Sequence, residues 1–167
     1  MYAEWRRVFR IDWRKTVNLL LDALDEAFDH KSWHGTNLRG SLRRVTAEEA
    51  VRRPGPGRHN IWEIALHCAY WKYAVWRQLT GAKRASFPLK GSNFWLRDKA
   101  GEQLWAQEIG LLEETHRQLR EAAGALKPSD WLKKPVKSKY TCEFLVRGAA
   151  AHDLYHAGQI QLIKRLV

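Results

Sequence analysis

The last segment of the chain repeats core-type residues at the spacing of an α-helix. From Thr141, a suitable N-cap, to the C-terminus, seven such positions are separated by four, three, four, four, three and four residues. They are Leu145, Ala149, His152, His156, Ile160, Ile163 and Val167. Because positions three and four apart share one face of a helix, this stripe needs a partner surface that buries it. The segment therefore indicates a bundle of helices.

Two earlier segments carry stripes of the same kind. In a helix that starts after Asn60, and in a second helix over residues 98–126, core-type residues recur at spacings of three and four. The stripes are Ile64, His67, Trp71 and Ala74 in the first helix, and Trp105, Ile109, Leu112, His116, Leu119, Ala123 and Leu126 in the second. A further amphipathic helix is expected over residues 14–28. No segment alternates like a β-strand, so the sequence predicts an all-α bundle.

Capping patterns mark where these helices begin and end. Thr46 with Glu49 forms a capping box, and Asn60 with Glu63 resembles one at the start of the next helix. Gly81 is a stop signal. The loop that follows it, "AKRASFPLKGSNFWLR", is longer than an ordinary connection and is expected to have a function. A basic loop, "KKPVKSKY", precedes the last helix.

The chain fits one domain, which we expect to span residues 1–167 with residues 1–31 as an N-terminal helical extension. Its two cysteines, Cys68 and Cys142, lie inside expected helices and are too few for a disulfide framework, which indicates buried thiols in a reducing cytosol. No apolar run reaches the ~18 residues of a membrane span, and "MYAEWRRVFRIDWRKT" is too polar for a signal peptide. We therefore expect a soluble, cytoplasmic protein without a membrane partner.

The charge balance of the chain favours anionic partners. It has 29 Lys and Arg against 18 Asp and Glu, a formal net charge of +11, which invites a nucleic-acid interpretation. The basic residues are spread along the chain, however, and no DNA-binding or RNA-binding motif surrounds them. We favour solvated surface charge and do not expect nucleic acid as a partner. Of the nine tryptophans, most should lie in the core and some should line a pocket.

Three of the predicted core positions carry histidine. His152 and His156 stand four residues apart on one face of the last helix, and His67 stands in the stripe of another helix. Burying a neutral imidazole without a hydrogen-bond partner costs about 1 to 3 kcal/mol, so three together are unfavourable. A divalent cation bound by the three ring nitrogens removes this penalty and leaves a coordination position open, as in catalytic metal sites. Hydrogen-bonded core histidines are the alternative.

The residues around these histidines have competing explanations. The metallopeptidase motif H-E-x-x-H needs glutamate after the first histidine, whereas Asp153 follows His152, and this argues against a peptidase. Asp153 is then either a surface charge, which we favour, or an acceptor that orients a metal ligand. Glu63 lies one turn before His67 and could orient it, but its capping position already explains it.

Other polar residues near the stripes are weaker candidates. His116 has three alternative interpretations: a fourth metal ligand, a general acid or base, or a core histidine with one hydrogen bond. We favour the core histidine. Tyr155 and Gln159 lie beside the turn that carries the two ligands, and they either reach a substrate or pack in the bundle. The remaining histidines are expected to be structural: His30, His34 and His59.

Three segments resemble the DinB/YfiT-like superfamily, from about residue 32 to the end of the chain. They are "SWHGTNLRGSL", "RPGPGRHNIWEIALHCAYWKYAV" and "AAAHDLYHAGQIQLIKRL". The resemblance implies an all-α four-helix bundle of this type, to which the N-terminal helix before Ser32 is additional. It also implies a three-histidine metal site that falls on His67, His152 and His156. It also implies a divalent ion such as zinc, nickel, iron or manganese and commonly a homodimer. In characterised branches it implies a thiol-dependent transferase or isomerase that uses bacillithiol, mycothiol or glutathione.

The leading functional hypothesis is a divalent-metal-dependent enzyme in which the ion lowers the pKa of a bound thiol or water. We favour thiol-dependent S-transferase-like activity on a small-molecule substrate, which we expect to be anionic. A low-molecular-weight thiol is the expected cosubstrate, because its carboxylates suit the cationic side chains of the long loop. The alternatives are a hydrolase with metal-bound hydroxide, a non-catalytic metal-binding or nucleic-acid-binding module, and a purely structural bundle. The sequence does not identify catalytic residues beyond the ligands.

Overall fold

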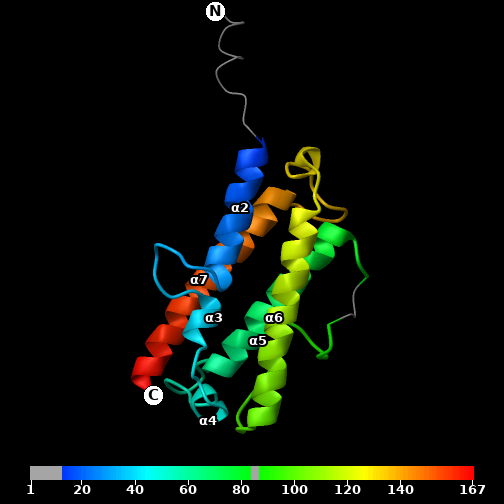
Figure 1. Cartoon of the computed structure of the whole chain (residues 1–167). Helices are drawn as coiled ribbons and strands as arrows, with labels where there is room; N and C mark the ends of the chain where they lie inside the picture. The colour runs from blue at the N-terminus through cyan, green and yellow to red at the C-terminus, as the bar shows by residue number, and fades with distance from the viewer. Residues whose placement is uncertain (1–12, 84–86) are drawn as a thin grey trace, which may run out of the picture.

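The computed structural model describes residues 13–83 and 87–167, which fold into helices without a β-strand, so the all-α prediction is confirmed (Figure 1). The long helices are α2 (Trp13–Phe28), α5 (Ile61–Thr80), α6 (Glu102–Gly124) and α7 (Cys142–Leu166). Shorter helices are α3 (Leu38–Ser41), α4 (Ala47–Ala50) and the 3₁₀-helix η1 (Pro128–Asp130). Most of the N-terminal segment judged too polar for a signal peptide, and residues 84–86 of the long loop, lie outside the described residues.

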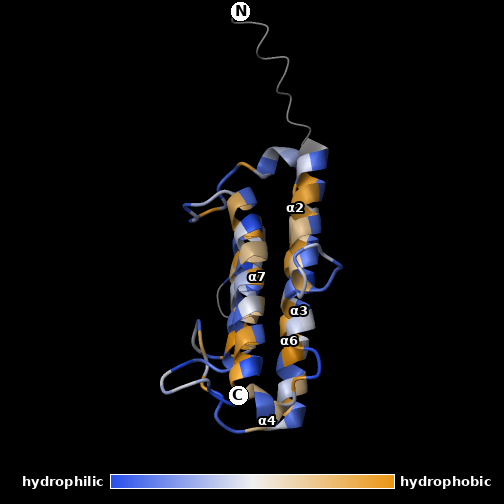
Figure 2. Cartoon of the chain, turned by 90° about the vertical axis from the view of Figure 1, so that its left-hand side faces the viewer, coloured by the Kyte–Doolittle hydropathy of each residue, from blue (hydrophilic) through white to orange (hydrophobic). Residues whose placement is uncertain are grey.

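The four long helices pack side by side along one axis. Both α2 and α5 contact both α6 and α7, so the helices follow one another around the bundle in the order α2, α7, α5, α6 (Figures 1 and 2). The expected N-terminal helix is α2, and it packs as one of the four long helices. Among the described helices, none combines the length and the hydropathy that crossing a bilayer requires.

The bundle core consists of two apolar clusters separated by a polar layer. Trp62 and Ile160 belong to the first cluster, and Leu119 and Val146 belong to the second. Between the clusters, buried polar residues of α5, α6 and α7 contact one another, and they are Lys72, His116 and Asp153 respectively. Cys68 and Cys142 are free and buried, as predicted.

The predicted helix starts are confirmed at three caps. Thr46 forms a full capping box, and Thr141 caps α7. Asn60 accepts a hydrogen bond from the Glu63 backbone N–H at 2.9 Å, but the Glu63 carboxylate binds other partners and does not complete a box. Gly81 ends α5 with a φ of 71°, a left-handed conformation that glycine adopts without strain.

The helix predicted over residues 98–126 is α6, with the bounds Glu102–Gly124. The chain before it is anchored by Arg97, whose N–H donates to Glu63 at 3.2 Å and whose guanidinium pairs with Glu108. Asn60 Nδ2 also donates to the Arg97 carbonyl at 2.6 Å. These bonds fasten the end of the long loop to the start of α5. Asn93 and Phe94 of the loop contact His67, so the loop lies over the face of α5 that carries this histidine.

Candidate metal centre

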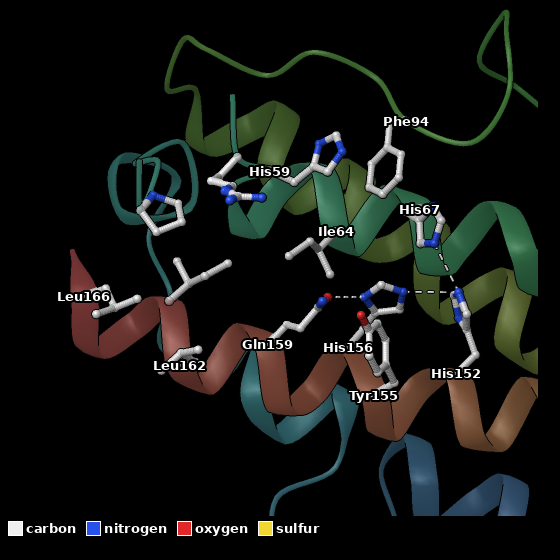
Figure 3. A pocket seen from close by; sticks show the side chains of 13 residues that line it. His59, Ile64, His67, Phe94, His152, Tyr155, His156, Gln159, Leu162 and Leu166 are labelled. Carbon is white, nitrogen blue, oxygen red and sulfur yellow. Dashed lines mark hydrogen bonds between the residues drawn. The ribbon is translucent and has the colours of Figure 1, made fainter. Parts of the chain in front are cut away.

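Three imidazoles meet between α5 and α7 (Figure 3). His67 Nε2 lies 3.1 Å from His152 Nε2, and His156 Nε2 lies 3.2 Å from the same atom. These residues form a group that could hold a metal ion, with one possible ligand atom from each and all three atoms within 4.8 Å of one another. The structure thus brings together the three histidines that the helical spacing selected.

The hydrogen bonds of two imidazoles decide their tautomers. His67 Nδ1 lies 2.9 Å from the Asn93 carbonyl oxygen, and His156 Nδ1 lies 2.7 Å from Gln159 Oε1. Both oxygens can only accept, so each Nδ1 carries the proton and donates it. The Nε2 atoms of His67 and His156 therefore present lone pairs to His152.

With these tautomers, the two close contacts among the Nε2 atoms cannot both be hydrogen bonds, because too few protons lie between them. Because His67 and His156 each have their single proton on Nδ1, only His152 can place a proton among the three Nε2 atoms. One N–H cannot satisfy two acceptors on different sides. A divalent cation that accepts all three lone pairs resolves the conflict, so the donor set fits a metal ion.

The imidazoles are neutral at physiological pH. Burial, together with the neighbouring histidines and Lys72, lowers the pKa of His152 to about 3. Burial likewise lowers the pKa of His156 to about 4 and lowers that of His67. Neutral imidazoles are the form that binds metals, so protons compete weakly for these nitrogens near neutral pH.

The long loop between α5 and α6 orients His67. Phe94 stacks on its ring with centroids 4.1 Å apart, and the Asn93 carbonyl accepts its Nδ1 proton. Asn93 has a φ of 74°, a left-handed conformation that asparagine tolerates better than most residues, and its Oδ1 accepts from Trp71 Nε1 at 3.1 Å. The sequence did not single out Asn93, and only the length of its loop pointed to a function.

Gln159 and Tyr155 contribute differently to the centre. Gln159 Oε1 accepts the His156 proton one turn further along α7, so this residue orients a candidate ligand. Tyr155 is 63% exposed, lies edge-on to His156 with ring centroids 5.0 Å apart, and lines the adjoining pocket. Both residues line the pocket, and Tyr155 is the more exposed of the two.

A pocket of about 710 Å³ begins at the histidines and runs toward the C-terminal end of α7 (Figure 3). All three imidazoles line its inner end, and Leu162 and Leu166 line its far end. Arg58 is the cationic side chain among its lining residues. The long loop contributes Phe94 but none of its described lysines or arginines to the lining, so the cation beside the pocket comes from the segment before α5.

Asp153 is not the surface charge that we favoured, because it is fully buried in the polar layer. Its Oδ2 accepts a hydrogen bond from Lys72 Nζ, and burial raises the pKa of Asp153 to about 6 while Lys72 opposes the rise. Its Oδ1 has no hydrogen-bond partner within the described ranges. The prediction was wrong because helical spacing places the residue after His152 beside the core stripe and does not show that α5 presents a lysine there.

Glu63 orients a different histidine from the one proposed. Its buried carboxylate pairs with Arg53 and accepts from His59 Nδ1 at 2.8 Å, and no hydrogen bond joins it to His67 in the part of the chain that is described. His59 in turn stacks on Phe94 with ring centroids 3.7 Å apart. The Glu63 carboxylate therefore supports the wall of the pocket through His59 and does not make the capping contact that explained it in the sequence.

The other histidines lie away from the centre. His116 is a buried core residue, as favoured: its Nδ1 accepts from Lys72 Nζ at 3.2 Å, and its ring stacks on Phe28 at 3.8 Å. Burial and the charge of Lys72 lower its pKa to about 2. His30 and His34 are exposed in the loop after α2.

The chain matches a known protein family over most of its length. The family model described as the DinB superfamily matches residues 30–160, a range that includes all three clustered histidines and the long loop. Neither the curated proteins nor the solved structures contain a significant match to the chain.

Proposed function

The chain belongs to the DinB superfamily, and from this premise we propose that it is a divalent-metal-dependent enzyme with thiol-dependent S-transferase-like activity. The observation that carries the proposal is the convergence of three neutral imidazoles at the inner end of an open pocket. Three protein ligands beside an open pocket are typical of a catalytic metal site, because a structural site closes its coordination sphere with protein atoms.

His67, His152 and His156 would hold the ion through nitrogen donors, which suit zinc, nickel and iron better than manganese. An ion bound there supplies a Lewis acid that lowers the pKa of a thiol in the pocket and so makes it nucleophilic at neutral pH. Asn93 and Gln159 keep the Nε2 lone pairs directed at one point by accepting the Nδ1 protons.

The pocket residues would bind the thiol substrate. Arg58 matches a carboxylate of an anionic low-molecular-weight thiol, and the Tyr155 hydroxyl can bond to its polar groups. During transfer, the sulfur forms a bond to an electrophilic carbon and the leaving group departs with the bonding electron pair. The thiol proton passes to solvent through the open side of the pocket.

Elemental analysis tests the first part of this proposal. Protein purified without an affinity tag should contain near one equivalent of a divalent metal per chain, and a His67, His152 and His156 triple alanine variant should contain almost none. Turnover should then appear when a thiol and an electrophile are supplied together. Wild-type protein that neither contains nor takes up metal would leave the histidines as core residues and overturn the proposal.

Hydrolysis is the second candidate, because the same open pocket admits water to the three-histidine group. The two activities differ in their need for a cosubstrate. Metal-dependent turnover of an ester or amide in the absence of thiol would favour the hydrolase, whereas turnover that requires added thiol would favour the transferase.

A further inference from the structure

A second pocket adjoins the candidate metal centre on the other side of His152. It has a volume of about 230 Å³, lies between α5 and the N-terminal half of α7, and includes His152 among its lining residues. The larger pocket includes His152 as well, but it continues toward the C-terminal end of α7. The imidazole of His152 therefore stands where two separate pockets meet.

Aromatic side chains form the walls of this second pocket. Trp71 lies on the α5 side and is 43% exposed, and Tyr140 and Phe144 lie on the α7 side with 40% and 45% exposure. Tyr140 and Phe144 stack with centroids 4.6 Å apart, and the Trp71 indole is fixed by its hydrogen bond to Asn93. These rings are thus held in place while they remain accessible, which is the condition for a preformed aromatic binding site.

The two charged residues that line this pocket neutralise each other. Lys72 and Asp153 both line it, but they are buried and form an ion pair with each other. Val75, Leu145 and Ala149 complete an apolar surface around them. A site of this kind favours a neutral, flat ligand over an ionised one, because an ion in the pocket would lose hydration without gaining an unpaired counter-charge.

We propose that this pocket binds a neutral planar aromatic group, of one or two fused rings, that belongs to the second substrate. The proposal rests on the function proposed above, in which the thiol occupies the larger pocket, and it adds that the electrophile occupies the second pocket, which shares His152 with the first. The difference in volume, 230 against 710 Å³, assigns the smaller partner to the aromatic pocket.

Two glycines of α7 provide a matched test. Gly148 lines the aromatic pocket, whereas Gly158 lines neither pocket. Both are exposed, and a Cβ built on either meets no atom within 4 Å. Gly148→Leu should therefore fill the pocket without a clash, and Gly158→Leu should add the same side chain to the same helix elsewhere. Leucine also has the higher helix propensity, so neither variant should lose its fold.

The probe is 2-naphthol, and its binding to metal-loaded protein is measured by titration calorimetry. The control ligand is decahydro-2-naphthol, which has the same carbon skeleton and hydroxyl group but no aromatic ring. Wild type should bind 2-naphthol about tenfold more tightly than the saturated analogue, because ring contacts add to apolar burial. Gly148→Leu should weaken binding of 2-naphthol by about tenfold or more, whereas Gly158→Leu should leave it within about twofold.

Three results would overturn the proposal: no binding of 2-naphthol by wild type, equal binding of the saturated analogue, or equal effects of the two glycine substitutions. Metal content is measured on the same samples, and it reports on the proposed function alone. A protein that holds its metal but does not bind 2-naphthol refutes the aromatic pocket only. A protein that binds 2-naphthol at the pocket but holds no metal refutes the enzyme proposal and with it the role of the ligand as a second substrate.

Discussion

Gln159 and Asn93 act on the candidate ligands through one oxygen atom each. Each accepts the Nδ1 proton of one imidazole, and this leaves the Nε2 lone pair of that imidazole directed at the shared point. The Asn93 oxygen belongs to the backbone and persists in most substitutions, whereas the Gln159 oxygen belongs to the side chain. Gln159 is therefore the position where the orientation of a ligand can be removed by a single substitution.

Gln159→Leu should weaken metal binding by about 10- to 100-fold without unfolding the bundle, because His156 loses the acceptor that fixes its tautomer and ring. Gln159→Glu, which keeps an acceptor oxygen, should retain most of the affinity. Competition with a chromophoric chelator measures the affinity, and Gln161→Leu on the same helix serves as the control. Unchanged affinity in Gln159→Leu would mean that the hydrogen bond does not orient the ligand.

His116 should make stability depend on pH in a defined direction. Its pKa is about 2 in the folded protein, against an ordinary value of 6.5, so the unfolded chain takes up this proton first as the pH falls. The stability associated with neutral His116 is therefore present above about pH 6.5 and is lost progressively as the pH falls toward the folded pKa.

His116→Asn keeps an acceptor for Lys72 but cannot titrate, and it should reduce the loss of stability between pH 6.5 and about pH 5 by roughly 1 to 2 kcal/mol. Urea unfolding at the two pH values measures the difference. The comparison is made with metal removed from both proteins, so that the clustered histidines contribute equally. Identical slopes in wild type and variant would show that His116 is not neutral in the folded state.

The elements that carry the centre were largely predictable from spacing alone. The three-and-four periodicity of α5 and α7 placed His67, His152 and His156 on inward faces, and the caps at Asn60 and Thr141 set the start of each helix. Periodicity assigns a residue to a face of its own helix but does not identify the residue that faces it from another helix.

For that reason, two features of the site could not be predicted from the sequence. The pairing of Asp153 with Lys72 joins positions 81 residues apart, and neither position stands in the stripe assigned to its helix. The contact of Asn93 with His67 uses a backbone carbonyl, which every residue has, so the identity of Asn93 does not reveal it. Both contacts depend on how one segment packs against another, and helical periodicity does not predict that packing.

The polar layer joins α5, α6 and α7 through Lys72, which donates to Asp153 and to His116. Lys72→Met should destabilise the bundle by about 3 to 5 kcal/mol, because it leaves a buried carboxylate without its counter-charge. The double variant Lys72→Met with Asp153→Leu should recover most of that loss, since replacing both ions by apolar side chains removes the desolvation penalty as well.

Chemical denaturation of the two single variants and the double variant gives the coupling energy. The exposed pair of Arg147 with Glu143 provides the matched control on α7, and its removal should change stability little. If the double variant is no more stable than Lys72→Met, the loss of stability does not come from the unpaired Asp153 carboxylate. The ion pair itself would then stabilise the layer.

At the scale of the whole molecule, the bundle presents the candidate centre in the middle of the α5 and α7 interface, with one pocket toward each end of α7. The two helices that supply the histidines also contribute residues to the polar layer and to both apolar clusters. An ion bound by side chains from both helices would therefore link segments that separate when the chain unfolds, and metal binding should be coupled to global stability.

Removing the metal should lower the thermal stability of the whole bundle. A ligand that binds only the folded state stabilises it by about 4 kcal/mol when its free concentration exceeds Kd about a thousandfold, which corresponds to a rise in Tm of roughly 10 °C for a chain of this size. Calorimetric scans of chelator-treated protein should show this rise when zinc or nickel is restored, with a size that grows with metal concentration. The triple alanine variant of His67, His152 and His156 should show no such response, because it lacks the donors. A rise of equal size in that variant would place the metal elsewhere on the chain, and no rise in wild type would mean that the three lone pairs do not bind an ion in the folded protein.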